Sequence, residues 1–206
     1  MPEGPQPGNA PGRRRVPKPA RSRELVNRVL TAAGELFAER GYADTNTNLV
    51  AEHAEVSVGS LYQFFASKDE ILAALQEDWT ERLGRALDER LRADLEAGPV
   101  ETIEHVLDIH AAFNSDPPGL LGFLLTAPVA TPSTENVVAA IRRRVDERLE
   151  VLVPGMDVER RRVAASMIVH ISNGLYTVGR SEGATNAAVR AEVQQALLNY
   201  VRTLSE

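Results

Sequence analysis

The sequence of 206 residues contains no cysteine. This absence excludes disulfide bonds and thiolate metal sites and favours a reducing compartment, so we expect a cytoplasmic protein. Also missing is any apolar run of about 18 residues, the length that a membrane-spanning helix requires, and we expect no membrane partner. The first residues are rich in Pro, Gly and Arg and include no apolar stretch, so no secretory signal is predicted.

An overall positive charge, which is common in nucleic-acid-binding proteins, is absent too, because the formal net charge is −6. The charge is unevenly distributed, however. Residues 1–68 contain nine Lys and Arg against seven Asp and Glu, whereas the remainder contains fourteen against twenty-two. This asymmetry indicates a basic arm joined to an acidic body, although a solvated tail that only aids solubility would have the same composition.

The periodic segments all have helical spacing, and none alternates with period two for long enough to predict a strand. We therefore predict an all-α fold. Residues 1–20 form a predicted disordered basic arm, residues 21–72 a three-helix N-terminal domain, and residues 73–206 a second helical domain. The expected helices run from Ser22 to Arg40, from about residue 46, from Ser57, over 68–93, around 103–113, over 120–127, from about 133 to 154, and over about 157–180 and 185–204.

Two short helices joined by a tight turn and packed on a third are typical of a helix-turn-helix, here at about residues 46–65. Thr45, Asn46 and Thr47 offer three possible N-caps for the first short helix, and Ser57 is the expected N-cap of the second. Small residues on the second short helix, such as Gly59, would let its backbone approach the major groove of DNA.

Two longer patterns carry a family resemblance. The pattern A-x-x-L-F-x-x-x-G-Y from Ala33 to Tyr42, followed by V-S-V-G-S-L-Y-Q-F-F-x-S-K from Val56 to Lys68, resembles the TetR family of bacterial transcriptional regulators over roughly residues 24–72. The resemblance implies DNA contacts at Asn46, Thr47, Ser57, Val58, Gly59, Ser60, Tyr62, Gln63 and Lys68. By analogy with homeodomain arms, the basic side chains Arg13, Arg14 and Arg15 are expected in the minor groove.

Three residues depart from the family pattern. Glu55 stands in the turn where glycine is usual, and a positive φ there would be strained. Phe64 lacks the hydroxyl or imidazole with which that position often binds phosphate. Val58 offers only apolar contact, for example to a thymine methyl group.

The resemblance further implies a homodimer formed by the last two helices, whose two reading heads would match a palindromic operator. The residues expected at this interface are Ile168, Ile171, Leu175, Val193, Leu197, Tyr200 and Val201. Their stripes at helical spacing would equally suit packing within one chain.

The middle helices would enclose an unidentified small-molecule ligand if the resemblance holds. The expected lining residues are Trp79, Leu107, His110, Phe113, Leu121, Phe123, Leu124, Met167, His170, Asn173 and Tyr176. The polar members matter most, because a buried polar group without a partner costs about 1–3 kcal/mol and needs a neighbour, water or a ligand. Apolar residues at this spacing are more often simply core.

No metal site or cofactor is predicted, because His105 and His110 lie five residues apart and do not share a helix face. The sequence also offers no pairing of a nucleophile with a base, so we expect a regulator and not an enzyme. We predict a repressor that a small inducer releases from its operator. The alternatives are a DNA-binding regulator without a ligand and an all-helical carrier or enzyme that uses His110 and His170.

Overall fold

The computed structural model of the chain describes residues 18–93, 97–127, 137–182 and 186–204, which form nine α-helices and no strand. The predicted all-α class is therefore confirmed. The helices are α1 (Lys18–Arg40), α2 (Thr47–His53), α3 (Val58–Tyr62), α4 (Lys68–Ala93), α5 (Pro99–Ser115), α6 (Leu120–Thr126), α7 (Val137–Leu152), α8 (Val158–Glu182) and α9 (Asn186–Leu204). Within these residues, no helix combines the length and apolarity needed to cross a bilayer.

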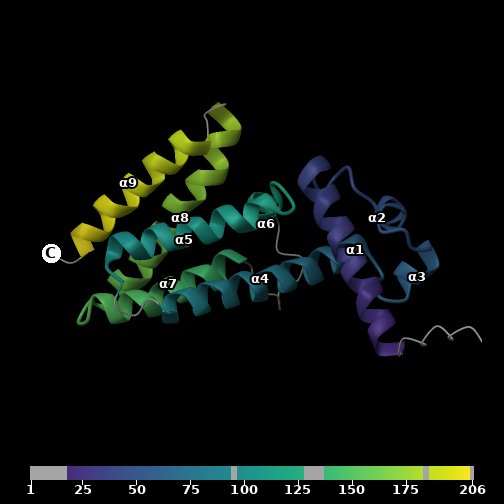
Figure 1. The fold of residues 1–206 in the computed structure, drawn as a ribbon, viewed down its shortest axis with the longest axis horizontal. Coiled ribbons are helices and arrows are strands. Elements are labelled where there is room, and N and C mark those ends of the chain that lie inside the picture. The colour runs from purple at the N-terminus through teal and green to yellow at the C-terminus, as the bar shows by residue number, and fades with distance from the viewer. Residues whose placement is uncertain (1–17, 94–96, 128–136, 183–185, 205–206) are drawn as a thin grey trace, which may run out of the picture.

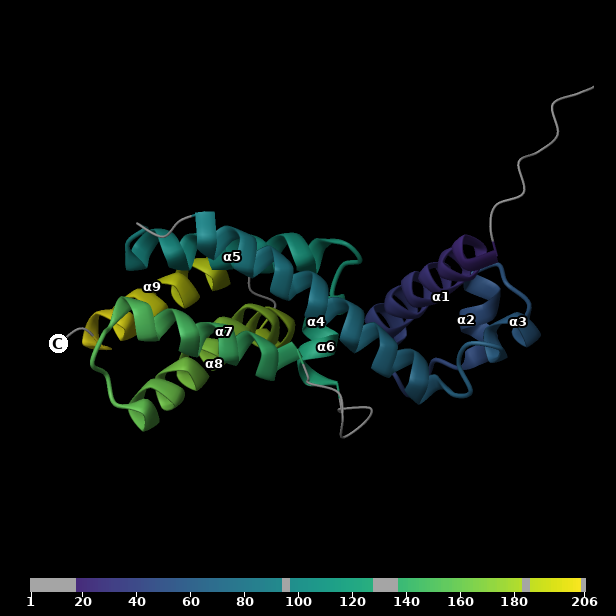
Figure 2. The ribbon, with the colours of Figure 1, turned by 90° about the horizontal axis from the view of Figure 1, so that it is seen from below.

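The molecule is elongated, with α1, α2 and α3 forming a head at one end and α5, α7, α8 and α9 forming a body at the other (Figure 1). The long helix α4 belongs to both parts, and α6 lies where they meet (Figure 2). At this junction Leu120 of α6 packs against Gly34 of α1, where a Cβ would lie 2.8 Å from Leu120 Cδ2. The rings of Phe37 and Phe123 stack beside it at 5.5 Å. The head is thus attached to the body through two contacts, α4 and α6.

Short polar side chains set the helix starts of the head. Asn46 caps α2 by accepting a hydrogen bond from the Leu49 N–H at 3.0 Å, and Ser57 caps α3 by accepting from the Ser60 N–H at 3.0 Å. Ser67 accepts from the N–H of Glu70 at 3.2 Å at the start of α4. The Glu70 carboxylate accepts a hydrogen bond from the Ala66 N–H at 2.7 Å, one residue before the Ser67 N–H that a capping box would use.

One helix boundary differs from the prediction. Helix α1 begins at Lys18, four residues before the expected start, and so includes part of the predicted arm. Pro19 is compatible with this extension, because a proline in the first turn lacks an N–H that would have no helical partner anyway. Residues 1–17, which include the three arginines of the arm, lie outside the described residues.

The apolar stripe of α9 faces the chain's own core. Val193, Leu197 and Val201 are buried against Ile103 and Leu107 of α5. The prediction that these three residues form a dimer interface is therefore wrong. The other predicted interface residues, Ile168, Ile171, Leu175 and Tyr200, are partly buried against the same interior clusters.

A different face of the last helices is open. Val163, Met167 and Val178 of α8 are 57%, 44% and 44% exposed, and His170 on the same side of the helix is also exposed. Met167 and His170 were predicted to line an interior pocket, and that prediction is wrong for both. The family resemblance and their apolar neighbours placed them inside, whereas the packing of α8 on α7 and α9 turns them outward.

Candidate nucleic-acid interface and interior site

Helix α3 buries one side and presents the other. Leu61 is fully buried and Phe65 just beyond the helix is 6% exposed, whereas Val58 and Tyr62 are 39% and 49% exposed. A Cβ added to Gly59 would meet no atom of the described structure within 4 Å. Packing within the head therefore does not require this glycine, although glycine inside a helix costs about 1 kcal/mol relative to alanine.

Hydroxyl groups from both short helices meet on this exposed surface. Thr47 Oγ1 and Tyr62 Oη lie 2.9 Å apart, which links the start of α2 to the end of α3. Ser57 Oγ and Ser60 Oγ lie 2.7 Å apart at the start of α3. The fold thus pairs four of the predicted DNA-contacting residues in two separate hydroxyl contacts near the solvent, where hydroxyls can bond phosphate oxygens. Asn46, Gln63 and Phe64 are exposed beside them.

Lys68 has a structural role that the sequence did not reveal. Its ammonium donates to the carbonyl oxygens of Tyr42 at 2.6 Å and Thr45 at 2.7 Å, and it lies 4.0 Å from the centroid of the Tyr42 ring. These contacts tie the loop before α2 to the N-terminus of α4. Two of the three ammonium hydrogens are used, so the predicted phosphate contact of Lys68 depends on the third and stays a prediction.

The loop is also held by Tyr42, whose hydroxyl donates to the carboxylate of Asp69. Burial of the phenol, together with the hydrogen bond and negative charge of Asp69, raises the pKa of Tyr42 to about 12. The phenol therefore stays protonated and remains a donor at physiological pH.

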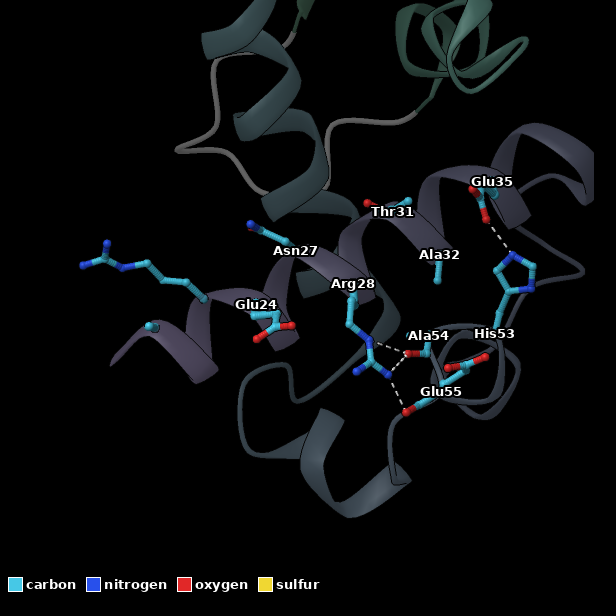
Figure 3. A pocket seen from close by; sticks show the side chains of 11 residues that line it. Glu24, Asn27, Arg28, Thr31, Ala32, Glu35, His53, Ala54 and Glu55 are labelled. Carbon is cyan, nitrogen blue, oxygen red and sulfur yellow. Dashed lines mark hydrogen bonds and ion pairs between the residues drawn. The ribbon is translucent and has the colours of Figure 1, made fainter. Parts of the chain in front are cut away.

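The turn between α2 and α3 contains the strained residue that the sequence indicated. Glu55 has a φ of 52°, a left-handed conformation that usually favours glycine. Arg28 of α1 reaches across to this turn, and its guanidinium donates from Nε to the Ala54 carbonyl at 3.0 Å and from Nη2 to the Glu55 carbonyl at 2.5 Å (Figure 3). Sequence reasoning counted Arg28 only as part of the basic charge and missed this contact.

A surface groove of about 660 Å³ lies between α1 and this turn, and Figure 3 shows the side chains around it. At one side of the groove, His53 Nε2 lies 2.6 Å from the carboxylate of Glu35. Arg28 and the His53–Glu35 pair both join α1 to the end of α2. Together they fix the angle at which α1 supports the helix-turn-helix.

Most residues predicted to line a ligand pocket form a closely packed aromatic core instead. The rings of Trp79 and Phe113 lie 5.5 Å apart, and those of His110 and Tyr176 lie 6.1 Å apart. The Tyr176 hydroxyl donates to the His110 carbonyl at 3.3 Å. Leu107, Leu121 and Leu124 are buried in the same interior, with Phe123 and Asn173 partly buried.

His110 is the polar group in this core with an unsatisfied side chain. It is 2% exposed, and among the described residues neither ring nitrogen has a hydrogen-bond partner. Burial lowers the pKa of His110 to about 4, because the charged imidazolium would lose its hydration. The ring is therefore neutral at physiological pH and offers one donor and one acceptor.

A second feature is a small, partly open cavity of about 80 Å³ in the body. Its walls come from α4, α5, α7, α8 and α9, and none of the predicted pocket residues lines it. Ile168, Leu197 and Val201, which were predicted for the dimer interface, do line it. The sequence could not distinguish these roles, because each requires the same apolar residues at helical spacing.

The described residues contain no group of three or more His, Asp or Glu side chains that could hold a metal ion. On α5, the side chains of Glu104, His105, Asp108 and His110 do not all point in the same direction. Asp108 is exposed and pairs with Arg190 of α9, whereas His110 points into the core.

Comparison with known proteins places the head in a family. Residues 29–75 match the family described as bacterial regulatory proteins, tetR family. An HTH-type transcriptional repressor of Mycobacterium tuberculosis is 29% identical over 137 residues, which cover 64% of this chain and 66% of that protein, just under two thirds of its length. The HTH-type transcriptional repressor KstR of Rhodococcus jostii is 27% identical over 182 residues, which cover 85% of this chain and 83% of that protein.

The overall fold is also similar to that of a TetR-family regulator, over a larger part of the chain. The crystal structure of a TetR-family transcriptional regulator from Streptomyces coelicolor superposes with a TM-score of 0.65 at 25% identity, covering 87% of this chain and 99% of that one. The match includes the body as well as the head. Over residues 29–75 the chain thus matches the TetR family of bacterial transcriptional regulators, and its overall fold is similar to that of a TetR-family regulator.

Proposed function

We propose that the protein is a cytoplasmic homodimeric repressor that binds a palindromic operator and is released from it by a small molecule. The observation that carries the DNA-binding part is the exposed face of α3, where Gly59 has no packing role, together with the hydroxyl pairs Thr47–Tyr62 and Ser57–Ser60 at the two ends of the helix. A glycine at this position removes the one side chain that would keep the helix backbone away from base edges.

The proposed dimer uses the outer face of α8 in place of the residues first predicted. Val163, Met167 and Val178 repeat along one exposed side of this helix, and an exposed apolar stripe of this kind is typical of a protein–protein contact. A two-fold dimer would place the two α3 helices in successive major grooves, about 34–36 Å apart. The operator is then expected to be a palindrome.

Release of the operator would follow from linkage between the two parts of each chain. A ligand that binds the body better in one arrangement of the heads weakens operator binding by the same factor. Helix α4 and the contact of α6 with α1 are the two routes by which a change in the body would reach the head.

Genomic DNA captured by the purified protein and then sequenced tests this proposal. We expect enrichment of a short palindromic site by the wild type and by a Val151→Ala control, since Val151 is exposed on α7 far from the head. A Tyr62→Ala variant should lose the enrichment, because it removes the hydroxyl paired with Thr47. Absence of any enriched site with the wild type would overturn the DNA-binding proposal.

A further inference from the structure

The helix-turn-helix lacks the cationic side chains with which many DNA-binding proteins read guanine. From Gly41 to Ser67 the sequence contains no lysine or arginine, whereas it contains the acidic residues Asp44, Glu52 and Glu55. Helix α3 itself has no charged residue. The commonest base-specific contact joins a lysine or arginine to the O6 and N7 atoms of guanine. Such a contact therefore cannot come from α2 or α3.

Exposed apolar side chains are concentrated on α3 and just after it. In the described part of the head, the large hydrophobic residues that are exposed are Val58, Tyr62 and Phe64, at 39%, 49% and 39%. Single exposed apolar residues are normal on a protein surface, but a group confined to residues 58–64 indicates a contact surface. The part of the DNA that meets α3 should therefore offer an apolar group of its own, because burial favours apolar surface on both sides.

Four positions of α3 and its C-cap share one side of the helix. Val58 and Tyr62 are four residues apart, as are Gly59 and Gln63, and residues with this spacing lie on the same side. Gln63 has helical backbone angles, with φ −70° and ψ −20°, so it continues this side beyond Tyr62. All four residues are exposed, whereas Leu61 points into the core. This side is the one that α3 presents to a partner.

Gly59 leaves an empty space between Val58 and Gln63. No atom of the described structure lies within 4 Å of the place where a Cβ of Gly59 would be. Side chains on a helix lean toward its N-terminus, so the carboxamide of Gln63 can extend over this space. A carboxamide provides both a donor and an acceptor, which are the two groups that bond N7 and N6 of adenine.

Val58 has the chemistry to contact one base in particular. It is the first residue of α3, directly after the Ser57 cap, and the N-terminal residues of a recognition helix are those that contact base edges. Its side chain contains no polar atom. In the major groove, the apolar group that a base presents is the C5 methyl group of thymine. Against the edge of another base, an isopropyl group would desolvate polar atoms without replacing their hydrogen bonds.

We infer that α3 reads A·T base pairs in each operator half-site, with Val58 against the C5 methyl group of a thymine and Gln63 bonded to N6 and N7 of an adenine. The two contacts select A·T pairs without a cationic side chain. This inference rests on the proposed function, because the bases are read in this way only if α3 enters the major groove.

The first test determines which base pairs depend on each side chain. The full chain selects duplexes from a pool with a randomised core, and the bound duplexes are sequenced. We expect the wild type and the Val151→Ala control, altered on α7 far from the head, to select the same half-site. Val58→Ala should lose the preference at a position that is thymine in that half-site, and Gln63→Ala at a position that is adenine. Loss of preference at G·C positions, or at no position, would overturn the inference.

The second test removes single groups from the selected DNA. Deoxyuridine in place of the thymine lacks only the C5 methyl group, and 7-deazadeoxyadenosine has a C–H group in place of the adenine N7. Fluorescence anisotropy measures the dissociation constants. For the wild type, deoxyuridine in one half-site should weaken binding about fourfold, as expected for one methyl group left in water. The deaza base should weaken binding about threefold or more, because one hydrogen bond is lost.

Each DNA change should affect mainly the proteins that retain the matching side chain. Deoxyuridine should weaken the binding of Gln63→Ala as much as that of the wild type, but that of Val58→Ala by less than about twofold, since groups in contact are not additive. The deaza base should give the reverse pattern.

The outcomes distinguish this inference from the proposed function. Equal losses with deoxyuridine in the wild type and in Val58→Ala would assign the methyl group to another side chain, such as the exposed Phe64, and would overturn the inference. A selected site that tolerates both modified bases would also overturn it, while DNA binding itself would stand. If the wild type selected no sequence from the pool, the proposed function would be rejected and the inference with it.

Discussion

Glu55 shows how a single strained residue is held by a side chain far away in the sequence. A left-handed conformation costs a non-glycine residue about 1–2 kcal/mol, and Glu55 has no side-chain feature that relieves this cost. The compensation comes from Arg28, whose guanidinium bonds the carbonyl groups of Ala54 and Glu55. These carbonyls lie at the C-terminal end of α2, where a cation is also favoured by the helix dipole.

Removal of that guanidinium should destabilise the head. We expect Arg28→Met to lower the free energy of unfolding by about 1–3 kcal/mol, because the part-buried Ala54 carbonyl and the exposed Glu55 carbonyl lose a charged donor. The companion Glu55→Gly should raise it by about 1 kcal/mol by relieving the strain. Urea unfolding followed by circular dichroism measures both, with Arg23→Met as the control at an exposed position of α1. Equal losses of unfolding free energy in Arg28→Met and Arg23→Met would contradict a role of Arg28 in holding the turn at Glu55.

His110 gives a prediction about pH. Its pKa of about 4 in the folded chain lies below its ordinary value of 6.5, so the unfolded chain binds the proton first. The stability that depends on neutral His110 is complete above pH 6.5 and is lost as the pH falls toward 4, by up to about 1.4 kcal/mol for each pH unit. Urea unfolding between these limits should show a shallower pH dependence for His110→Leu than for the wild type. Identical slopes would show that His110 does not titrate on unfolding.

At the scale of the element, the short helix α3 contains Gly59. This glycine reduces the stability of the helix, and the packing of α3 in the head does not require it. Gly59 lowers helix propensity, yet no neighbour occupies the space where its Cβ would lie. The free protein therefore loses helix stability at Gly59, and we expect a gain in DNA affinity that appears only in the complex with DNA.

The substitution Gly59→Ala should therefore have opposite effects on stability and binding. We expect the free energy of unfolding to rise by up to about 1 kcal/mol, since alanine is the better helix former. Affinity for the captured DNA, measured by fluorescence anisotropy, should fall because the added methyl group faces the bases. A stabilised variant with undiminished affinity would mean that the α3 backbone does not approach DNA closely at this point.

Helices α8 and α9 show what an apolar stripe does and does not indicate. Their spacing correctly predicts helices with one apolar side each. The stripe of α9 was assigned to a partner chain, but it packs on α5 of the same chain. Ridge and groove packing works equally well within and between chains, so periodicity could not decide between them.

At the scale of the whole molecule, the exposed face of α8 is the proposed dimer interface. We expect Val163→Glu with Met167→Glu to convert the proposed dimer into a monomer, because each buries a charge in an apolar contact. Sedimentation velocity measures the change, and DNA capture should be lost with it. Val151→Glu, at a position that is 65% exposed on α7, should remain dimeric. A double variant that stays dimeric would place the interface elsewhere.

Sequence patterns predicted the features that depend on neighbouring residues. The helical fold, the helix-turn-helix and the caps of Ser57 and Ser67 were predictable, since a cap bonds an amide only three residues away, whereas the cap of α2 was narrowed to three residues, of which Asn46 is the one observed. The strain at Glu55 was predictable for the same reason, because it arises from the residue's own backbone.

Only the tertiary structure decided which distant groups meet. Arg28 bonds a carbonyl 26 residues away, Lys68 bonds the Tyr42 carbonyl at the same separation, and Arg144 bonds Asp88 across 56 residues. Such contacts depend on how helices are placed in space, and a long flexible side chain carries no local signal of its partner. The outward face of α8 and the small cavity beside Arg144 follow from that placement, which is why sequence patterns assigned those residues to other roles.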